Sequence, residues 1–276
     1  MAKFFGFVQF DFAGTLPLAD GRYLAGSPEG DDETVLVLQR LGAPAIAERR
    51  RRRGRSAPAD PEPAPVALTR ATVIRAASPF EGPAEAARWL DEACESEETV
   101  EELAVEAIAT LNRALHAQAV AAADPHGRQL APEQAERVLL GHGSGEETAD
   151  GRFTDARQVD LTPRTASRRR KREEELRPQE RVAAILRGRE HLDACETLLL
   201  RARADHDAGR DREAALQLRI GLEALLVELD GAMDDPDHEK DMATLREHQA
   251  AEQPPPTEET LAVCERVLRR RRVLRG

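Results

Sequence analysis

A glycine-rich string is the most prominent place in this sequence where chemistry could occur. It reads Gly141-His142-Gly143-Ser144-Gly145. A phosphate-binding loop places glycines between a strand and a helix N-terminus, where free backbone N–H groups meet the anion. A strand is predicted before this string, but two glutamates follow it and lead to a turn, and their charge would repel phosphate. We interpret residues 141–145 as glycine bulges in a twisted hairpin, and keep a small-molecule site there as an alternative.

Ser144 could act as a nucleophile only with the right neighbours. The nucleophile elbow of serine hydrolases needs a glycine two positions before and two positions after the serine. Those positions hold His142 and Glu146 here, so the sequence does not predict this type of active site.

His191 and Cys195 are four residues apart, so on a helix their side chains would share one face. Such a pair can be a nucleophile with its base, or half of a metal site. No second pair lies nearby, and both residues fall on a predicted core stripe, so we interpret them as packing residues. The sequence also has no HExxH motif and no EF-hand loop. We therefore predict no metal and no cofactor.

Arg201 and His206 have the Arg-x4-His spacing of HEPN-type ribonucleases. The helical bundle of that family also resembles the fold class predicted for this part of the chain. The resemblance implies that Arg201 and His206 would form the catalytic pair at a dimer interface, with arginine runs holding the RNA phosphates. A HEPN-like ribonuclease or RNA-binding protein is therefore an alternative reading of the function.

Residues 194–229 also resemble the helical hairpin of a tetratricopeptide repeat. The turn glycine, the alanine of the second helix, the large apolar residue and the small residue of that repeat correspond to Gly209, Ala214, Leu218 and Gly221. The resemblance implies a closely packed pair of helices. A single repeat cannot form a solenoid, because stacked neighbours must cover its apolar faces.

The segment Arg177–Gly231 is predicted to be a helical hairpin around which most of the chain is organised. One apolar stripe runs along its first helix: Ile185, Leu192, Cys195, Leu199 and Ala202. The second helix has two stripes: Ala215, Leu218, Leu222, Leu225 and Leu229, and then Leu216, Ile220, Ala224 and Val227. A helix that is apolar on most of its circumference is expected to be buried with neighbours on several sides. Two further helices are predicted at 238–251 and 258–272.

The first part of the chain has the alternation of a sheet, with two helices between residues 83 and 124. Residues 4–12 place Phe4, Val8, Phe10 and Phe12 on one side and polar residues on the other, which predicts a half-buried strand. The segment 19–23, Ala-Asp-Gly-Arg-Tyr, recurs at 149–153 with a final Phe, and Asp-Gly is a strong hairpin signal. We expect two similar turns in one sheet. The predicted strands are 4–12, 34–38, 66–74, 137–142 and 152–161.

Charge and composition limit the classes of function. The net charge of −11 argues against nucleic-acid binding by the whole molecule. Three arginine-rich runs, 49–53, 168–172 and 269–272, leave local nucleic-acid contacts possible, although such runs are usually solvated. Three cysteines without a CxxC motif indicate a reducing compartment, and no segment has the pattern of a signal peptide or a membrane span. We expect a cytoplasmic protein that does not bind membranes. Only three of the 40 basic residues are lysines, which suggests a GC-rich, hypothetically bacterial, genome.

These patterns predict an α+β fold with two domains. Residues 1–161 would form a mixed domain with an antiparallel sheet, two helices and a disordered Arg/Pro loop at 42–65. A charged linker, 162–177, would join it to an all-α domain at 178–276. We favour a non-enzymatic interaction or adaptor protein that self-associates, for example as a homodimer, or binds an unknown protein partner through its helical domain.

Overall fold

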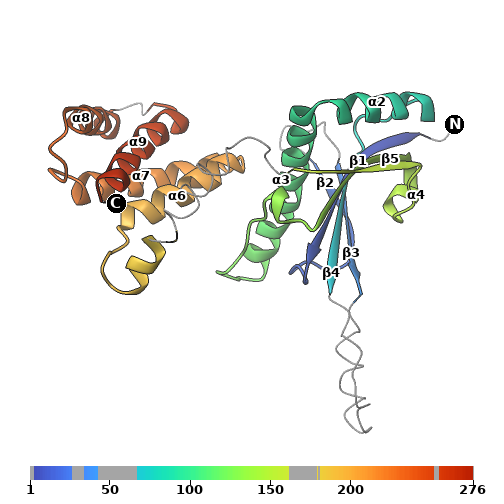
Figure 1. Cartoon of the computed structure of the whole chain (residues 1–276), viewed down its shortest axis with the longest axis horizontal. Coiled ribbons are helices and arrows are strands. Elements are labelled where there is room, and N and C mark those ends of the chain that lie inside the picture. Colours follow the sequence, from blue (N-terminus) through green and yellow to red (C-terminus); the bar gives the residue numbers. More distant parts are fainter. Residues whose placement is uncertain are drawn as a thin grey trace, which may run out of the picture. The chain divides into compact units, whose positions relative to one another are not determined.

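In the computed structural model the chain forms two units, Met1–Arg164 and Thr165–Gly276. The structure describes residues 3–26, 34–42, 67–161, 179, 181–251 and 255–275. The first unit is a sheet with helices and the second is built from helices, so the predicted α+β class with a helical C-terminal region is confirmed (Figure 1). The predicted linker and, apart from Gly42, the predicted disordered loop lie outside the described residues.

A six-stranded antiparallel sheet forms the framework of the first unit, in the order β2-β3-β4-β1-β5-β6. The central strand β1 pairs with β4 on one side and with β5 on the other, so that Phe7 lies opposite both Ile74 and Gly141. The expectation that the N-terminal strands and the 137–161 segment share one sheet is confirmed. The strands are β1 Phe4–Ala13, β2 Gly21–Ala25, β3 Thr34–Leu41, β4 Leu68–Arg75, β5 Arg137–Ser144 and β6 Asp155–Val159.

Helices cover both faces of this sheet (Figure 1). The long helices α2 (Pro83–Glu95) and α3 (Glu97–Ala121) pack on the face that carries Val8, Phe10 and Phe12. The short helix α4 (Gly145–Ala149) packs on the opposite face, where Phe7 contacts Val37, Ile74 and Ala149. Alternate residues of β1 therefore contribute to two separate cores.

Strand β1 is buried on both faces, so the prediction of a half-buried strand is wrong. Gln9 and Asp11, which were expected to face solvent, are buried. Both are satisfied by neighbouring strands: the Oγ1 of Thr72 donates to the Oε1 of Gln9, and Arg70 and Arg137 bind the carboxylate of Asp11. Buried polar groups of this kind are tolerated because they keep their hydrogen bonds.

The prediction of a hairpin at Asp20-Gly21 is also wrong. Gly21 begins β2, but β2 is separated from β1 by β3 and β4 in the sheet. The matching Asp150-Gly151 pair ends α4 rather than joining two strands directly, and Gly151 has a φ of 80°. The turn chemistry was recognised, but the strands that each turn connects depend on long-range pairing.

In the described part of the second unit, four helices are longer than ten residues: α6 (Ala194–Asp207), α7 (Asp211–Glu228), α8 (Pro236–Ala250) and α9 (Thr257–Arg275). Helices α6 and α7 form the closely packed hairpin, which reverses at Gly209, where φ is 67°. Gly221 lets the two helices approach, because a Cβ at this position would lie only 3.1 Å from the side chain of Leu199. Leu225, Leu245 and Leu261 are among the residues of the common core.

The first helix of this hairpin is shorter than predicted. A helical segment at 181–186 ends in a turn with Gly188 at a φ of 67°, and α6 begins only at Ala194. The carboxylate of Glu228, at the end of α7, accepts hydrogen bonds from the backbone N–H groups of Ala194 (3.2 Å) and Cys195 (3.0 Å). A helix can begin here because its free N–H groups are satisfied by a carboxylate from the neighbouring helix.

Candidate functional site

The glycine-rich string occupies the end of β5 and is packed on both sides. A Cβ on Gly141 would lie 2.6 Å from the carbonyl oxygen of Asp155 and from the ring of Phe7, and one on Gly143 would lie 2.4 Å from the Oγ1 of Thr148. Close packing therefore requires both glycines. The five-residue helix α4 begins at Gly145, where no helix is predicted, and the predicted turn follows it at Asp150-Gly151.

His142 lies on the sheet face that α2 covers, opposite Gly6, and its side chain is 2% exposed. Neither ring nitrogen has a hydrogen-bond partner within the described part of the chain. Burial lowers the pKa of the imidazole, while the charge of Asp155 acts in the opposite direction and that of Arg157 lowers the pKa further. A neutral imidazole enclosed in this way cannot reach a ligand at the surface.

Arg201 and His206, the two residues of the alternative ribonuclease reading, have different surroundings on α6. Arg201 is exposed, whereas the Nε2 of His206 lies 2.9 Å from a carboxylate oxygen of Glu258 in α9. Five helical residues correspond to a rotation of about 140° between side chains. The carboxylate of Glu258 also binds Arg203, so His206 belongs to a network of ion pairs that joins α6 to α9.

His191 and Cys195 do not share a helix, so the predicted common face is absent. His191 lies before α6 and is exposed, whereas Cys195 is fully buried in the first turn of α6. Burial raises the pKa of the Cys195 thiol to about 12, with a further contribution from Glu228. A thiol with this pKa is a poor nucleophile. Within the described residues, no group of three or more His, Cys, Asp or Glu side chains is arranged to hold a metal ion.

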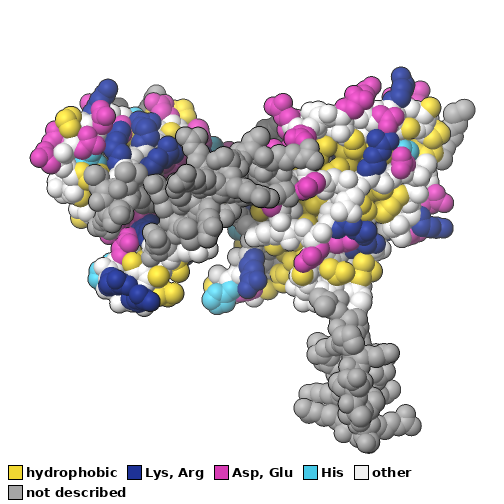
Figure 2. Space-filling view, viewed as in Figure 1, with side chains coloured by type: hydrophobic (Ala, Val, Ile, Leu, Met, Phe, Trp, Pro, Cys, Tyr) yellow, Lys and Arg dark blue, Asp and Glu magenta, His cyan; other side chains and the backbone are white. Residues whose placement is uncertain are grey.

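Two arginines of the run at 269–272 form ion pairs inside the second unit. Arg270 lies 2.6 Å from the carboxylate of Asp241, and Arg271 lies 2.6 Å from that of Asp193. On the face seen in Figure 2, acidic and basic side chains are interspersed over both units. The runs at 49–53 and 168–172 lie outside the described residues. The arginines with ion-pair partners have little charge left for phosphate.

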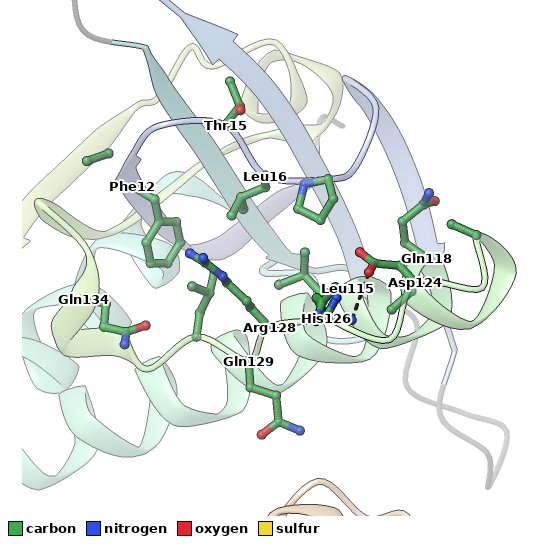
Figure 3. Close-up of a pocket in the computed structure, with 16 residues that line it drawn as sticks. Phe12, Thr15, Leu16, Leu115, Gln118, Asp124, His126, Arg128, Gln129 and Gln134 are labelled. Carbon is green, nitrogen blue, oxygen red and sulfur yellow. Dashed lines mark hydrogen bonds between the residues drawn. The ribbon is translucent and has the colours of Figure 1, made fainter. Parts of the chain in front are cut away.

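A pocket of about 620 Å³ opens in the first unit between the end of β1, the end of α3 and the following loop (Figure 3). Phe12, Leu16 and Leu115 line its apolar part. Asn112 fixes the loop, because its side-chain amide exchanges two hydrogen bonds, of 2.9 and 2.8 Å, with the backbone of Leu130. Sequence reasoning missed this pocket; a polar Asn within the apolar pattern of α3 was the available signal.

The charged side chains of this pocket are exposed to solvent. Asp124, His126 and Arg128 are all exposed, and Figure 3 shows the hydrogen bond that the backbone N–H of His126 donates to Asp124. Binding pockets usually combine an apolar lining with a few fixed polar groups. This pocket has the apolar lining but lacks buried polar groups, so it does not identify a ligand.

The outer face of α7 carries aliphatic side chains that are exposed to solvent. Leu216, Ile220 and Val227 are 53%, 55% and 77% exposed. The other stripe of the same helix, which includes Leu218 and Leu225, is buried in the core. The described helices α6, α8 and α9 do pack against α7 as predicted, but the prediction that its second stripe is buried as well is wrong for these three residues. We refer to Leu216, Ile220 and Val227 as the α7 stripe.

Comparisons with protein-family models, with curated proteins and with solved structures found no match to this chain. Among the described residues, no helix has both the length and the apolar character needed to cross a membrane.

Proposed function

We propose that the protein is a non-enzymatic interaction protein that binds another protein chain through the α7 stripe. The observation that supports this proposal is the exposure of Leu216, Ile220 and Val227, each more than half accessible to solvent on one helix. Burying an aliphatic side chain of this size contributes about 1.5–3 kcal/mol. Contiguous apolar surface that remains exposed in one chain is typical of an interaction site.

The surroundings of the stripe favour a protein over a lipid surface. Arg219 and Glu223 are exposed on α7 next to the stripe, and Glu213 is exposed near its start. Mixed charges around an apolar centre are typical of the rim of a protein interface. Helices that bind anionic membranes instead carry mainly Lys and Arg on their polar face.

The residues that could carry out catalysis support an enzymatic function less well than the α7 stripe supports an interaction function. His142 is enclosed, the thiol of Cys195 is buried, and His206 is engaged by Glu258. General acid–base and nucleophilic catalysis need a nucleophile and a base within hydrogen-bond reach of each other and of the substrate. Ser144 lies 2.5 Å from a carboxylate oxygen of Glu147, and Thr260 lies 3.0 Å from the Nδ1 of His248, but neither pair lines the pocket beside α3.

Photo-crosslinking in cells that naturally make the protein tests this proposal. A benzoyl-phenylalanine would replace Ile220 in one variant and Leu200, a residue of α6 with 65% exposure, in the control variant. We expect an adduct with a protein chain from position 220 and none from position 200. Absence of an adduct at position 220, or equal adducts at both positions, would overturn the proposal.

A further inference from the structure

We infer that the chain bound by the α7 stripe is a second copy of this protein, and that the two α7 helices pack antiparallel about a two-fold axis near Gly221. This inference rests on the proposed function and names its partner. Two-fold symmetric dimers are the commonest oligomers, and their interfaces must be self-complementary, because the same surface is used twice. The α7 stripe is self-complementary, and so are the charged residues beside it.

The spacing of the apolar residues is nearly symmetric about position 221. Spacings of four and seven residues keep Leu216, Ile220 and Val227 on one face of the helix. With a rise of about 1.5 Å per residue, Leu216 lies about 7.5 Å before Gly221 and Val227 about 9 Å after it. A two-fold axis at this point therefore places Leu216 against the second copy's Val227, and Ile220 beside its own counterpart.

The charged residues are symmetric about the same position. Arg219 and Glu223 lie two residues before and two residues after Gly221, and both are exposed. Neither has an ion-pair or hydrogen-bond partner within the part of the chain that the structure describes. In the antiparallel pair, each Arg219 faces the second copy's Glu223, which gives two ion pairs. Complementary charges of this kind fix the orientation of partners.

A parallel arrangement of the two helices does not have this complementarity. Arg219 and Glu223 are four residues apart and so lie on the same side of the stripe. With both helices in the same direction and register, this side of one copy lies across the interface from the same side of the other copy, so neither ion pair can form. The charge pattern therefore favours the antiparallel pair.

A single pair of helices is a small interface, so we expect a dimer with a dissociation constant on the order of micromolar. Sedimentation equilibrium of the purified full-length chain, over a concentration series that spans this range, would measure it. Ile220→Glu should make the protein monomeric throughout the series. The matched control Leu200→Glu introduces the same charge at an exposed apolar position of α6 (65% exposed, against 55% for Ile220) and should leave the dimer intact.

Charge reversal tests the antiparallel arrangement itself. Arg219→Glu should weaken the dimer about tenfold or more, since it replaces two ion pairs by two repulsions. The double variant Arg219→Glu/Glu223→Arg recreates both pairs and should restore the affinity. Circular dichroism of each variant checks that the helices are retained.

Several results would overturn the inference. These are a wild-type chain that stays monomeric, equal effects of Ile220→Glu and Leu200→Glu, or a double charge reversal that does not recover the dimer. A monomeric wild-type chain that still forms adducts with a different protein from position 220 in cells would remove this inference and leave the proposed function standing. Absence of all adducts would instead remove the proposed function.

Discussion

Arg22 in the edge strand β2 and Asp150 at the end of α4 form an ion pair, with 2.6 Å between the Nη2 and Oδ1 atoms. The two residues belong to the segments Ala19–Tyr23 and Ala149–Phe153, which share the pattern Ala-Asp-Gly-Arg-aromatic. The repeated segments therefore meet each other across the sheet face that α4 covers. This contact connects the end of α4 to the far edge of the sheet, beyond the strands on which the helix rests.

We expect this ion pair to contribute little to stability. The side chains of Arg22 and Asp150 are 45% and 49% exposed, so solvent screens their attraction. A double-mutant cycle with Arg22→Ala and Asp150→Ala, measured by urea unfolding, should give a coupling energy below about 1 kcal/mol. A coupling of several kcal/mol would show instead that the pair determines the position of α4.

The parts of the fold that could be predicted from the sequence depend on local patterns. The positions of β1, α3 and α9 were correctly predicted, because each follows from the period of its own element, although the polar face of β1 is buried. The hairpin at Asp20-Gly21 was wrong because turn residues do not specify which strands become neighbours. The length of the first helix of the hairpin was wrong because its start depends on Glu228, 33 residues beyond Cys195.

The candidate sites depend even more on tertiary context. The sequence showed both stripes of α7, but periodicity cannot tell whether a stripe is covered by the same chain or by another. The sequence also drew attention to His142 as part of a glycine-rich string, yet its enclosure beneath α2 follows from the pairing of β5 with β1. The pocket beside α3 arises where three separate segments meet, so no single motif marks it.

The carboxylate of Asp11 lies between Arg70 and Arg137, with its closest contacts at 2.8 and 2.7 Å. Burial raises the pKa of this carboxyl, but the hydrogen bonds and charges of the two arginines outweigh burial and lower it. Asp11→Ala leaves two guanidinium groups close together without their shared anion. We expect a loss of roughly 2–3 kcal/mol in the free energy of unfolding, less than for a fully buried pair because the arginines are partly exposed.

The pH dependence of the same group gives an independent check. Because the pKa of Asp11 is lower in the folded state, its contribution to stability is present above the unfolded pKa of about 3.9 and is lost as the pH falls below that value. The difference in the free energy of unfolding between wild type and Asp11→Asn, measured by urea unfolding, should therefore shrink below about pH 4. If this difference in unfolding free energy did not change with pH in this range, Asp11 would not be the ionised partner of Arg70 and Arg137.

Ala123, just after the end of α3, has a φ of 51°, the only positive φ of a non-glycine residue in the described parts of the chain. The backbone here closes the helix, because the N–H of Asp124 donates to the carbonyl of Ala119 at 2.8 Å. Glycine is the preferred residue at this position, since the left-handed conformation costs other residues about 1–2 kcal/mol. Ala123→Gly should therefore raise the free energy of unfolding by about 0.5–1 kcal/mol after the greater flexibility of glycine in the unfolded chain is counted.

The same substitution within the helix provides the control for Ala123. Ala117 is an exposed residue of α3, and Ala117→Gly should lower the free energy of unfolding by about 0.8–1 kcal/mol, the helix-propensity difference. Thermal or urea unfolding of the two variants should therefore give changes of opposite sign. Changes of the same sign would mean that the backbone at Ala123 is not strained.

His142 should make the first unit sensitive to mild acid. Burial, the largest effect, holds the pKa of its imidazole below the usual value, so between that usual value, about 6.5, and the folded pKa the unfolded chain binds more protons than the folded chain. Stability therefore falls as the pH decreases through this range. Asp155 and Arg157 are the charged groups that act on the ring, and they act in opposite directions.

His142→Leu removes this proton linkage while keeping an apolar side chain in the same enclosed position. The loss of unfolding free energy between pH 7 and pH 5, measured by urea unfolding, should be smaller in His142→Leu than in the wild type. His126→Leu is the control, because it removes an exposed imidazole of the same unit. Equal acid sensitivity of His142→Leu and the wild type would contradict this prediction. It would mean that water reaches the imidazole in the folded state, so that the ring can be protonated without loss of stability.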